Sequence, residues 1–322
     1  MPSGQKKDSP SRIAIAGIGG VGGYYGGMLA AHFQNFHGTE IHFIARGEHA
    51  EQIRRHGLKL ITDEQTVTAH PRSVTDEPAT LGKLDLIVLC CKAYDLEQLA
   101  ASLKSNLHER TLLLPLLNGI GHAERIEHIL HGVTCLHGCT YLVSKRSAPG
   151  TIRVSGNFNR LLFGKPGEEE KQMKAIEKIF TRAGIIAEYR SDILPKTWEK
   201  FSFLSPIATY TSAYDQNIGS ILADENASAE LTRLMKELIL LARHEGISMP
   251  MSVIQQNFEV MRSLPPATTS SMQVDFSSGN KTELETLTGY VVRKARAAGI
   301  EAPAYEKLYE ILLGKAYPPG RA

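Results

Sequence analysis

The chain has 322 residues, of which 42% are hydrophobic and 22% charged, and its formal net charge is +2 at pH 7. This length favours two domains. The nearly balanced charge, without a dense run of lysine or arginine, argues against a nucleic-acid-binding protein. The longest apolar stretches have only the length of strands, so no membrane span is predicted. Residues 1–11 are polar, and we expect a disordered tail there rather than a signal peptide.

The first predicted strand runs directly into a glycine-rich turn. Residues 13–16 are apolar, Gly17-x-Gly19-x-x-Gly22 follows them, and an Ala/Leu/Met-rich helix then extends to about residue 36. In a strand–turn–helix the first glycine permits the tight turn, the second lets a pyrophosphate approach the backbone, and the third lets the helix pack on the strand. Amides at the helix N-terminus favour an anion. This context predicts a dinucleotide site rather than a bare turn.

The end of the second predicted strand indicates which dinucleotide binds. Residues 40–45 are typical of a central strand, and the residue that follows the strand is Arg46. No acidic residue occupies this strand end. An acidic residue there would accept a hydrogen bond from a ribose 2′-hydroxyl, whereas an arginine suits a 2′-phosphate. Arg54 and Arg55 on the next helix could add positive charge. NADP(H) is the predicted cofactor, and an ordinary surface arginine at position 46 is the alternative.

The first half of the chain alternates strands and helices, which predicts an open, mostly parallel sheet. Further strands are predicted over residues 58–61, 66–70, 84–90, 111–117, 133–143, 150–156, 160–164 and 185–189, and helices over 48–56, 95–107 and 168–183. Pro115 lies inside one of these apolar runs and indicates an edge position or a local distortion of that strand.

Strand signals end near residue 191, and helical periodicities replace them. Helices are predicted over residues 195–214, 227–246, 251–262, 282–298 and 305–313, with prolines and glycines between them. We expect a dinucleotide-binding domain over residues 12–190 and a helical substrate-binding domain over 191–322, which would line a cleft. The four cysteines lie in or beside apolar runs without metal-ligand spacing, which favours reduced thiols in a cytoplasmic protein.

Reduction of a carbonyl needs a proton donor for the oxygen and groups that hold the substrate. Lys200 lies where the charged start of the predicted helix 195–214 becomes apolar, so we expect it to face the cleft, where burial would lower its pKa. Lys196, one turn earlier, is the competing candidate. A solvated lysine is the alternative for both.

A second group of polar side chains lies over residues 269–289. Glu283 and Glu285 are two positions apart and so face different sides of a helix, which leaves at most one of them for a site. Asn280 followed by Glu283 is also typical of a helix cap. In the first half, Lys92 and Asn118 each follow the carboxyl end of a predicted strand, where open α/β sheets bind ligands. An ordinary solvated lysine and a turn asparagine are the alternatives there.

Taken together, these segments resemble the ketopantoate reductase (2-dehydropantoate 2-reductase) family over residues 12–315. The matching segments are, in order, IAGIGGVGGYYG, ARG, CKAYD, LNGIG, WEK, SSMQVD and KTELETLTG. The resemblance implies a Rossmann-type domain followed by an all-helical domain like that of 6-phosphogluconate dehydrogenases. It further implies reduction of 2-dehydropantoate to (R)-pantoate with NADPH, in pantothenate synthesis. A small 2-oxo acid is the expected partner, with no nucleic acid, membrane or metal, and the sequence leaves a homodimer open.

The resemblance also assigns roles to particular residues. It makes Lys200 the general acid and Glu283 the carboxylate that engages the substrate. It places substrate binding at Asn118, Ser271 and Lys92, and cofactor binding at Gly17, Ile18, Gly19, Gly20, Val21, Gly22, Arg46, Lys92 and Asn118.

One departure from the family concerns Leu204 and Ala208, four and eight residues past Lys200, where members usually carry asparagines. An apolar wall there lacks donors for substrate oxygens and changes which 2-oxo acid is accepted. Nearby hydroxyls, at Ser202, Ser205 and Thr209, are not assumed to replace the amides. A reductase of a different 2-oxo acid is therefore the alternative, and a catalytically idle NADP(H)-binding sensor is the lesser one.

Overall fold

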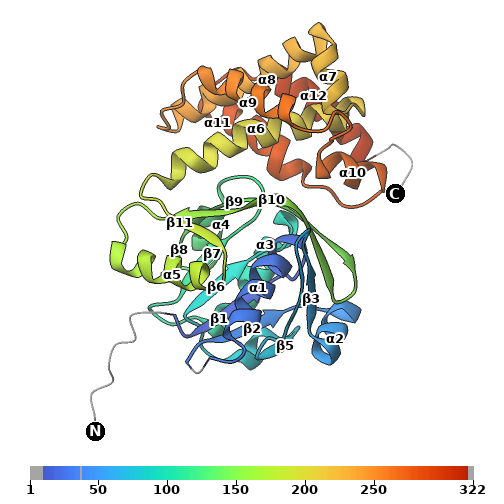
Figure 1. The fold of residues 1–322 in the computed structure, drawn as a ribbon. Helices are drawn as coiled ribbons and strands as arrows, with labels where there is room; N and C mark the ends of the chain where they lie inside the picture. The colour runs from blue at the N-terminus through green and yellow to red at the C-terminus, as the bar shows by residue number, and fades with distance from the viewer. Residues whose placement is uncertain (1–9, 37, 318–322) are drawn as a thin grey trace. The chain divides into compact units, whose positions relative to one another are not determined.

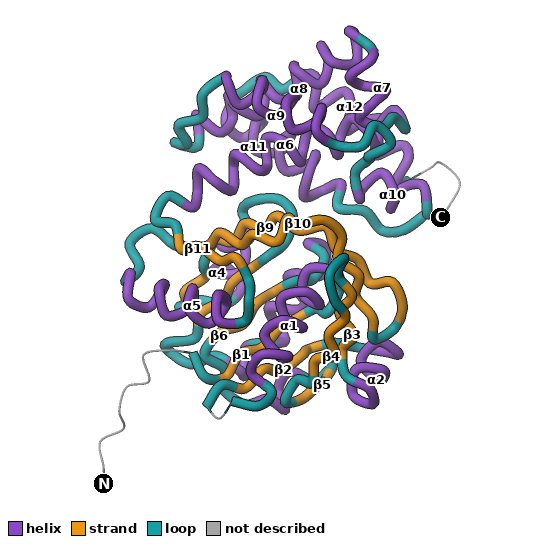
Figure 2. Tube along the Cα trace, viewed as in Figure 1, coloured by secondary structure: helices purple, strands orange, loops and turns teal. Residues whose placement is uncertain are grey.

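The computed structural model describes residues 10–36 and 38–317, so most of the predicted N-terminal tail lies outside the described residues. The chain divides into two compact units. The N-terminal unit comprises Met1–Leu117 and Gly121–Ile193, and the helical unit comprises Asn118–Ile120 and Leu194–Ala322. The structure agrees with the predicted class, since strands occur in the first unit and the described elements of the second are helical (Figure 2).

A six-stranded sheet forms the centre of the N-terminal unit (Figure 1). Its order is β5 (Ser73–Thr75), β2 (Glu40–Ile44), β1 (Arg12–Ala16), β6 (Leu86–Leu89), β7 (Leu112–Pro115) and β8 (Thr134–Cys135), and each neighbouring pair is parallel. The chain moves outward from β1 on one side and then returns to its other side at β6. The strand order therefore reverses between β1 and β6, which is where open α/β sheets bind ligands.

A second sheet holds the remaining strands. Its order is β11 (Ile186–Tyr189), β10 (Thr151–Gly164), β3 (Leu58–Ile61) and β4 (Thr66–Ala69), with β9 (His137–Ala148) antiparallel to β10. The predicted strands 150–156 and 160–164 are not separate strands of one open sheet, because both belong to β10, which has an irregularity between Val154 and Asn159. Apolar side chains of this sheet, such as Leu60 and Ile152, are as buried as those of the first. Local periodicity therefore does not distinguish the two sheets.

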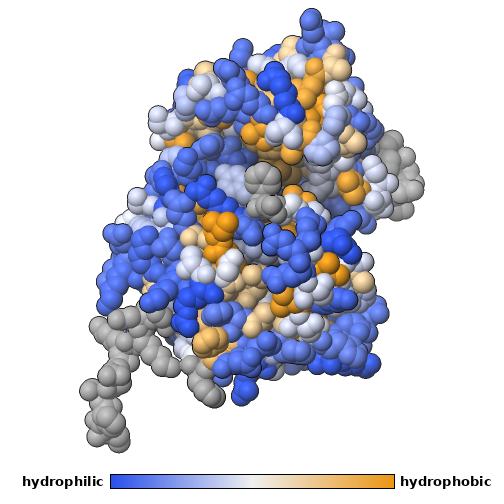
Figure 3. All heavy atoms as spheres, viewed as in Figure 1, coloured by the Kyte–Doolittle hydropathy of each residue, from blue (hydrophilic) through white to orange (hydrophobic). Residues whose placement is uncertain are grey.

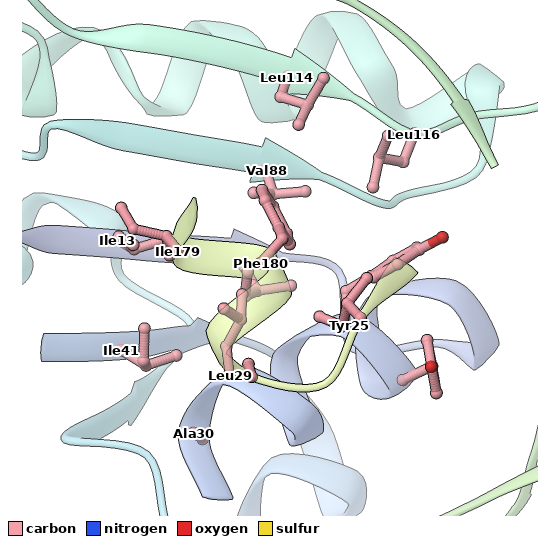
Figure 4. Packing of buried hydrophobic residues seen from close by; sticks show 14 of the residues in the cluster. Ile13, Tyr25, Leu29, Ala30, Ile41, Val88, Leu114, Leu116, Ile179 and Phe180 are labelled. Atoms are coloured by element: carbon pink, nitrogen blue, oxygen red, sulfur yellow. The ribbon is translucent and has the colours of Figure 1, made fainter. Parts of the chain in front are cut away.

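Two helices fill the space between the sheets and make one shared core. They are α1 (Gly20–Phe33) and α5 (Glu170–Arg182). In Figure 4, Tyr25 of α1 and Phe180 of α5 lie beside Val88 of the parallel sheet. The Tyr25 hydroxyl is hydrogen-bonded to the Thr140 hydroxyl of β9, which ties α1 to the second sheet as well.

Shorter elements complete the N-terminal unit. They are α2 (Gly47–His56), α3 (Leu96–Ser102), α4 (His122–Ile129) and three 3₁₀ turns at Pro78–Leu81, Ala93–Asp95 and Lys104–Asn106. The strand β5 and the helix α4 were not predicted, and the predicted helix 95–107 is broken into shorter pieces. Pro115 ends β7 where β8 no longer pairs with it, because β8 meets only Leu112 and Leu113. The strand β7 lies between β6 and β8, so the predicted edge position is wrong. Pro115 is tolerated because it lies past the two residues that pair with β8.

The helical unit is built around the long helix α6 (Ile193–Tyr214). The other elements are α7 (Ile218–Ala223), α8 (Glu225–His244), α9 (Ser252–Ser263), α10 (Ser271–Ser277), the π-helical turn η4 (Glu285–Gly289), α11 (Tyr290–Ala298) and α12 (Pro303–Ala316). The helices α7 and α10 were not predicted. Among the described residues, no helix is long and apolar enough to span a membrane. On the face drawn in Figure 3, each unit presents mainly hydrophilic residues, with smaller apolar groups scattered among these residues.

Candidate active site

The loop between β1 and α1 has the geometry that a dinucleotide site requires. Gly17 has a φ of +96°, and its amide donates a hydrogen bond to the Ile44 carbonyl at 3.0 Å. A Cβ on Gly22 would lie 2.0 Å from the Gly17 carbonyl oxygen, so a side chain there would prevent α1 from starting this close to β1. At Gly19, by contrast, a Cβ would meet nothing within 4 Å. The turn, the open cradle and the close helix packing thus fall on the glycines expected for them.

The open space at Gly19 suits a pyrophosphate. Gly19 is the N-cap of α1, and no side chain caps this helix end. Unpaired amides of a first helical turn and the helix dipole attract an anion. Gly20 serves a different purpose from Gly19, because a Cβ on it would lie 2.3 Å from the Ser144 carbonyl oxygen of β9. The side chain of Ile18 is buried and therefore points into the protein.

Arg46 stands at the end of β2 with its side chain 82% exposed. It lies 3.7 Å from the carboxylate of Asp95, which belongs to the 3₁₀ turn after β6. Arg54 is committed elsewhere, since it donates to the Val74 carbonyl at 3.0 Å and pairs with Asp76. Arg46 is therefore an exposed cation directly at this strand end, which is the position that suits a 2′-phosphate, while Arg55 is exposed on α2.

Lys92 and Asn118 follow the carboxyl ends of β6 and β7, as predicted, and both are half-buried. The chain leading to Lys92 passes close to the glycine loop, because a Cβ on Gly17 would lie 2.9 Å from the Cys90 carbonyl carbon. The Lys92 carbonyl then accepts the Asp95 amide at 2.9 Å, which starts the 3₁₀ turn. Asn118 belongs to the helical unit, a grouping that the sequence did not predict.

The two residues with predicted catalytic roles both lie in the helical unit. Lys200 is half-buried on α6. Glu283 is only 4% exposed and directly precedes the helical segment that starts at Leu284; its carbonyl accepts the amides of the third and fourth residues after it, at 3.0 Å each. The alternative of an Asn280 cap is wrong, because the helix begins four residues after Asn280.

Glu285 has different surroundings from Glu283, as their spacing predicts. It is exposed, forms an ion pair with Arg293 and accepts a hydrogen bond from the Tyr309 hydroxyl at 2.6 Å. These contacts join η4 to α11 and α12. Glu283 is thus the acidic side chain of this pair that is withdrawn from solvent, and Glu285 is a structural ion-pair partner.

A proline inside α6 leaves a backbone carbonyl for a distant side chain to satisfy. Pro206 has no amide hydrogen, so the Ser202 carbonyl four residues earlier lacks its helical donor. The side-chain amide of Asn257 in α9 donates to that carbonyl at 3.1 Å and to the Ser202 hydroxyl at 3.2 Å. Asn257 is only 6% exposed. Sequence analysis missed Asn257. Pro206 in a predicted helix was the available signal, although it does not identify the donor.

A second polar contact ties α6 to the turn that follows Glu283. The Ser205 hydroxyl donates to the Leu287 carbonyl at 2.8 Å and is 2.7 Å from the Tyr305 hydroxyl, while Thr209 and Thr288 are hydrogen-bonded at 2.7 Å. Leu287 and Thr288 belong to η4, and π-helical turns like it are frequent at functional sites. The helix that carries Lys200 and the turn beside Glu283 are therefore held together.

Three hydroxyls of α6 are engaged in hydrogen bonds within the helical unit. Ser202, Ser205 and Thr209 are each 0% exposed. They already have hydrogen-bond partners in the protein, so they do not supply the donors that the resemblance led us to expect from asparagines at positions 204 and 208. Ala208 is itself 1% exposed, and Leu204 packs against the core of the helical unit.

Ser271 begins α10 and is exposed. Its neighbour Ser270 is buried, caps α10 by accepting the Gln273 amide at 3.1 Å, and is 2.8 Å from the Thr211 hydroxyl. Ser270 therefore has a structural role, and Ser271 is the hydroxyl of this pair that stays accessible.

Over residues 10–36 and 38–317, no group of three or more His, Cys, Asp or Glu residues is placed to hold a metal ion. The four cysteines are thiols and form no disulfide, and burial raises the pKa of the Cys90 and Cys135 thiols above the ordinary value.

These features together indicate a nicotinamide-dependent oxidoreductase with a parallel-sheet domain and a helical domain. The features are the open glycine loop at the strand-order reversal, the exposed arginine at the next strand end and the half-buried lysine of the helical unit. The chain belongs to the ketopantoate reductase family. The model described as "Ketopantoate reductase PanE/ApbA" matches residues 13–168, and "Ketopantoate reductase PanE/ApbA C terminal" matches residues 192–316. It is an oxidoreductase of a family that uses NADPH.

Individual relatives cover nearly the whole chain. A 2-dehydropantoate 2-reductase of Halobacterium salinarum is 27% identical over 304 residues, which is 94% of this chain and 97% of the relative. The crystal structure of 2-dehydropantoate 2-reductase from Porphyromonas gingivalis W83 is 36% identical with a TM-score of 0.82, covering 95% and 100% of the two chains. A complex of D-mandelate dehydrogenase with NADH is 25% identical with a TM-score of 0.82, covering 95% and 98%.

Proposed function

We propose that the chain reduces 2-dehydropantoate to (R)-pantoate with NADPH. The observation that carries the proposal is the withdrawal of the Glu283 carboxylate from solvent, at 4% exposure, beside a turn that is hydrogen-bonded to the helix of Lys200. Such a carboxylate suits a hydroxylated substrate, whose hydroxyl would donate to it. The family match over both units supports the same reaction.

Each proposed role follows from the chemistry of a side chain. When bound, NADPH supplies the hydride that reduces the keto carbon. The loop Gly17–Gly22 would hold the pyrophosphate and Arg46 the 2′-phosphate, and Lys92 and Asn118 would contact cofactor and substrate. Lys200 donates a proton to the substrate's keto oxygen. Glu283 accepts the substrate's hydroxyl hydrogen, and Ser271 contacts its carboxylate.

A second candidate is a reductase of another 2-oxo acid, which the side chains of α6 favour. The apolar positions Leu204 and Ala208 provide no amide, and the hydroxyls around them are occupied. The D-mandelate dehydrogenase relative shows that proteins of this fold differ in substrate. A panel of 2-oxo acids, assayed by NADPH absorbance, separates the candidates. A clear preference for an acid other than 2-dehydropantoate would favour the second.

Replacement of Lys200 tests the proposed acid. The variant Lys200→Ala should lose at least about a hundredfold in kcat, because a positioned proton donor contributes about 10²–10⁴-fold, while its Kd for NADPH stays within about twofold. Lys196→Ala is the matched control, since Lys196 lies one turn away on α6 and pairs with Glu199 at 2.9 Å. Wild-type turnover by Lys200→Ala would contradict the assignment. Tight NADPH binding by the wild type with no turnover of any 2-oxo acid would instead indicate a sensor.

A further inference from the structure

We propose that Asp95 determines cofactor specificity. Its carboxylate shares the position of the cofactor's 2′ group with Arg46, so it weakens binding of a 2′-phosphate and accepts a hydrogen bond from the 2′-hydroxyl of NADH. The inference rests on the dinucleotide site assigned above to the glycine loop and Arg46. It concerns which nicotinamide dinucleotides this site accepts.

The position of the two side chains carries the argument. The strands β2 and β6 lie on either side of β1. Arg46 follows β2, and Asp95 ends the 3₁₀ turn after β6. Their Nη2 and Oδ2 atoms are 3.7 Å apart. The pair therefore bridges the strands that flank β1, at the strand end from which the glycine loop leaves. A 2′ group that reaches Arg46 thus comes within a few ångströms of the Asp95 carboxylate.

The pair is open to rearrangement by a ligand. Its separation exceeds a normal hydrogen bond, and the Arg46 and Asp95 side chains are 82% and 36% exposed. An exposed ion pair of this kind contributes little to stability, so Arg46 can turn to a phosphate at small cost. The carboxylate nevertheless stays nearby. Its repulsion of a phosphate dianion at about 6 Å in a solvated site weakens binding by about three- to tenfold.

Both kinds of ribose recognition therefore occur together in this chain. An arginine accommodates a 2′-phosphate, and an aspartate or glutamate accepts the 2′-hydroxyl. In many sites the end of β2 supplies one or the other. Here β2 supplies Arg46, while Asp95 arrives from the neighbouring strand β6. We expect the chain to bind NADH as well as NADPH, with a preference that Asp95 limits.

Direct binding measurements test the proposal without any oxo acid. Isothermal titration calorimetry on the full chain gives Kd for NADPH and for NADH. Asp95→Asn should tighten NADPH and weaken NADH by about three- to tenfold each. Arg46→Gln should weaken NADPH at least about tenfold and change NADH less than about twofold. Glu97→Gln is the matched control: it removes the same charge two residues away, from a pair with Arg125 at 2.8 Å, and should leave both values unchanged.

The outcomes separate this proposal from the proposed reaction. If Asp95→Asn changes both Kd values by the same factor, or leaves their ratio within about twofold of the wild type, the specificity role of Asp95 is overturned. The titrations contain no 2-dehydropantoate, so a failure of turnover with that acid leaves their result intact. If the wild type binds neither dinucleotide, both the specificity role and the proposed reaction are wrong.

Discussion

The glycine loop of the N-terminal unit and the α6–η4 contact of the helical unit bring backbone segments together by opposite means. At the loop, missing side chains allow the approach: a Cβ on Gly22 would lie 2.0 Å from the Gly17 carbonyl oxygen. In the helical unit, added polar side chains hold the segments, through Asn257 on the Ser202 carbonyl and Ser205 on the Leu287 carbonyl. The first device lies within six consecutive residues. The second device joins residues that are far apart in the sequence, by 55 positions for Asn257 and Ser202 and by 82 positions for Ser205 and Leu287.

The largest effect should come from filling the loop. Gly22→Ala places a methyl group against the Gly17 carbonyl oxygen and 2.8 Å from the Cys90 Cβ, so α1 must move away from β1. We expect the free energy of unfolding to fall by about 3 kcal/mol or more, measured by urea unfolding. NADPH binding should be lost as well, because the helix N-terminus moves with the helix.

Gly19→Ala is the matched control for that loop. Its Cβ meets no protein atom within 4 Å, and Gly19 has a φ of −84°, which an alanine adopts without strain. The free energy of unfolding should change by less than about 0.5 kcal/mol. The Kd for NADPH should rise by about tenfold or more, because the methyl group enters the space proposed for the pyrophosphate. Unchanged binding by Gly19→Ala would place the pyrophosphate elsewhere.

The same contrast explains what could be predicted from the sequence. Gly17, Gly19 and Gly22 lie close together and each has a distinct steric requirement, so their spacing alone indicated the loop. The reversal of strand order beside the loop was not predicted. The elements α7 and α10 have only six and seven residues, too few for a helical period to stand out. The assignment of β10 to a second sheet depends on partners distant in the chain.

The candidate site shows the same limit. Lys92, Asn118 and Lys200 were candidates from strand ends and a helix face. Helical spacing indicated only that one of Glu283 and Glu285 could face a site, and the resemblance to the family selected Glu283. Asn257 lacked any comparable signal, because its role is set by a carbonyl on another helix. Buried polar groups must find partners, but the sequence does not state which partner each one finds.

Breaking the Asn257 contact should have an intermediate effect. Asn257→Leu keeps the side chain's approximate size and leaves the Ser202 carbonyl buried without a donor, which should reduce the free energy of unfolding by about 1–3 kcal/mol. Pro206→Ala restores a backbone amide that can donate to that carbonyl. In urea unfolding, the double variant should therefore lose less than the sum of the single ones, with a coupling of at least about 1 kcal/mol. Strict additivity would show that Asn257 acts by packing alone.

The smallest effect concerns pH, where the two units should respond with opposite signs. In the N-terminal unit, burial and then the Arg146 charge lower the pKa of His49, whose Nδ1 accepts the Gly150 amide at 2.8 Å. In the unfolded chain the His49 imidazole is protonated near the ordinary histidine pKa of about 6.5, whereas in the folded chain it is protonated only at lower pH. Stability is therefore complete above that pH and falls as the pH drops below it. Burial lowers the pKa of His42 and His137 in the same way.

In the helical unit, burial raises the pKa of Glu237 although the Ala304 and Tyr305 amides donate to its carboxylate. The contribution of Glu237 to stability is complete below the ordinary glutamate pKa and is lost as the pH rises through the pKa of Glu237 in the folded chain.

Hydrogen exchange distinguishes the two units. Between pH 7 and pH 5.5, exchange rates corrected for intrinsic rates should increase in peptides of β1, β2 and α2, and should decrease or stay constant in peptides of α8 and α12. Each histidine contributes at most about 1.4 kcal/mol per pH unit. His49→Asn should flatten the response of the first set only, and an equal response of both sets would refute the assignment.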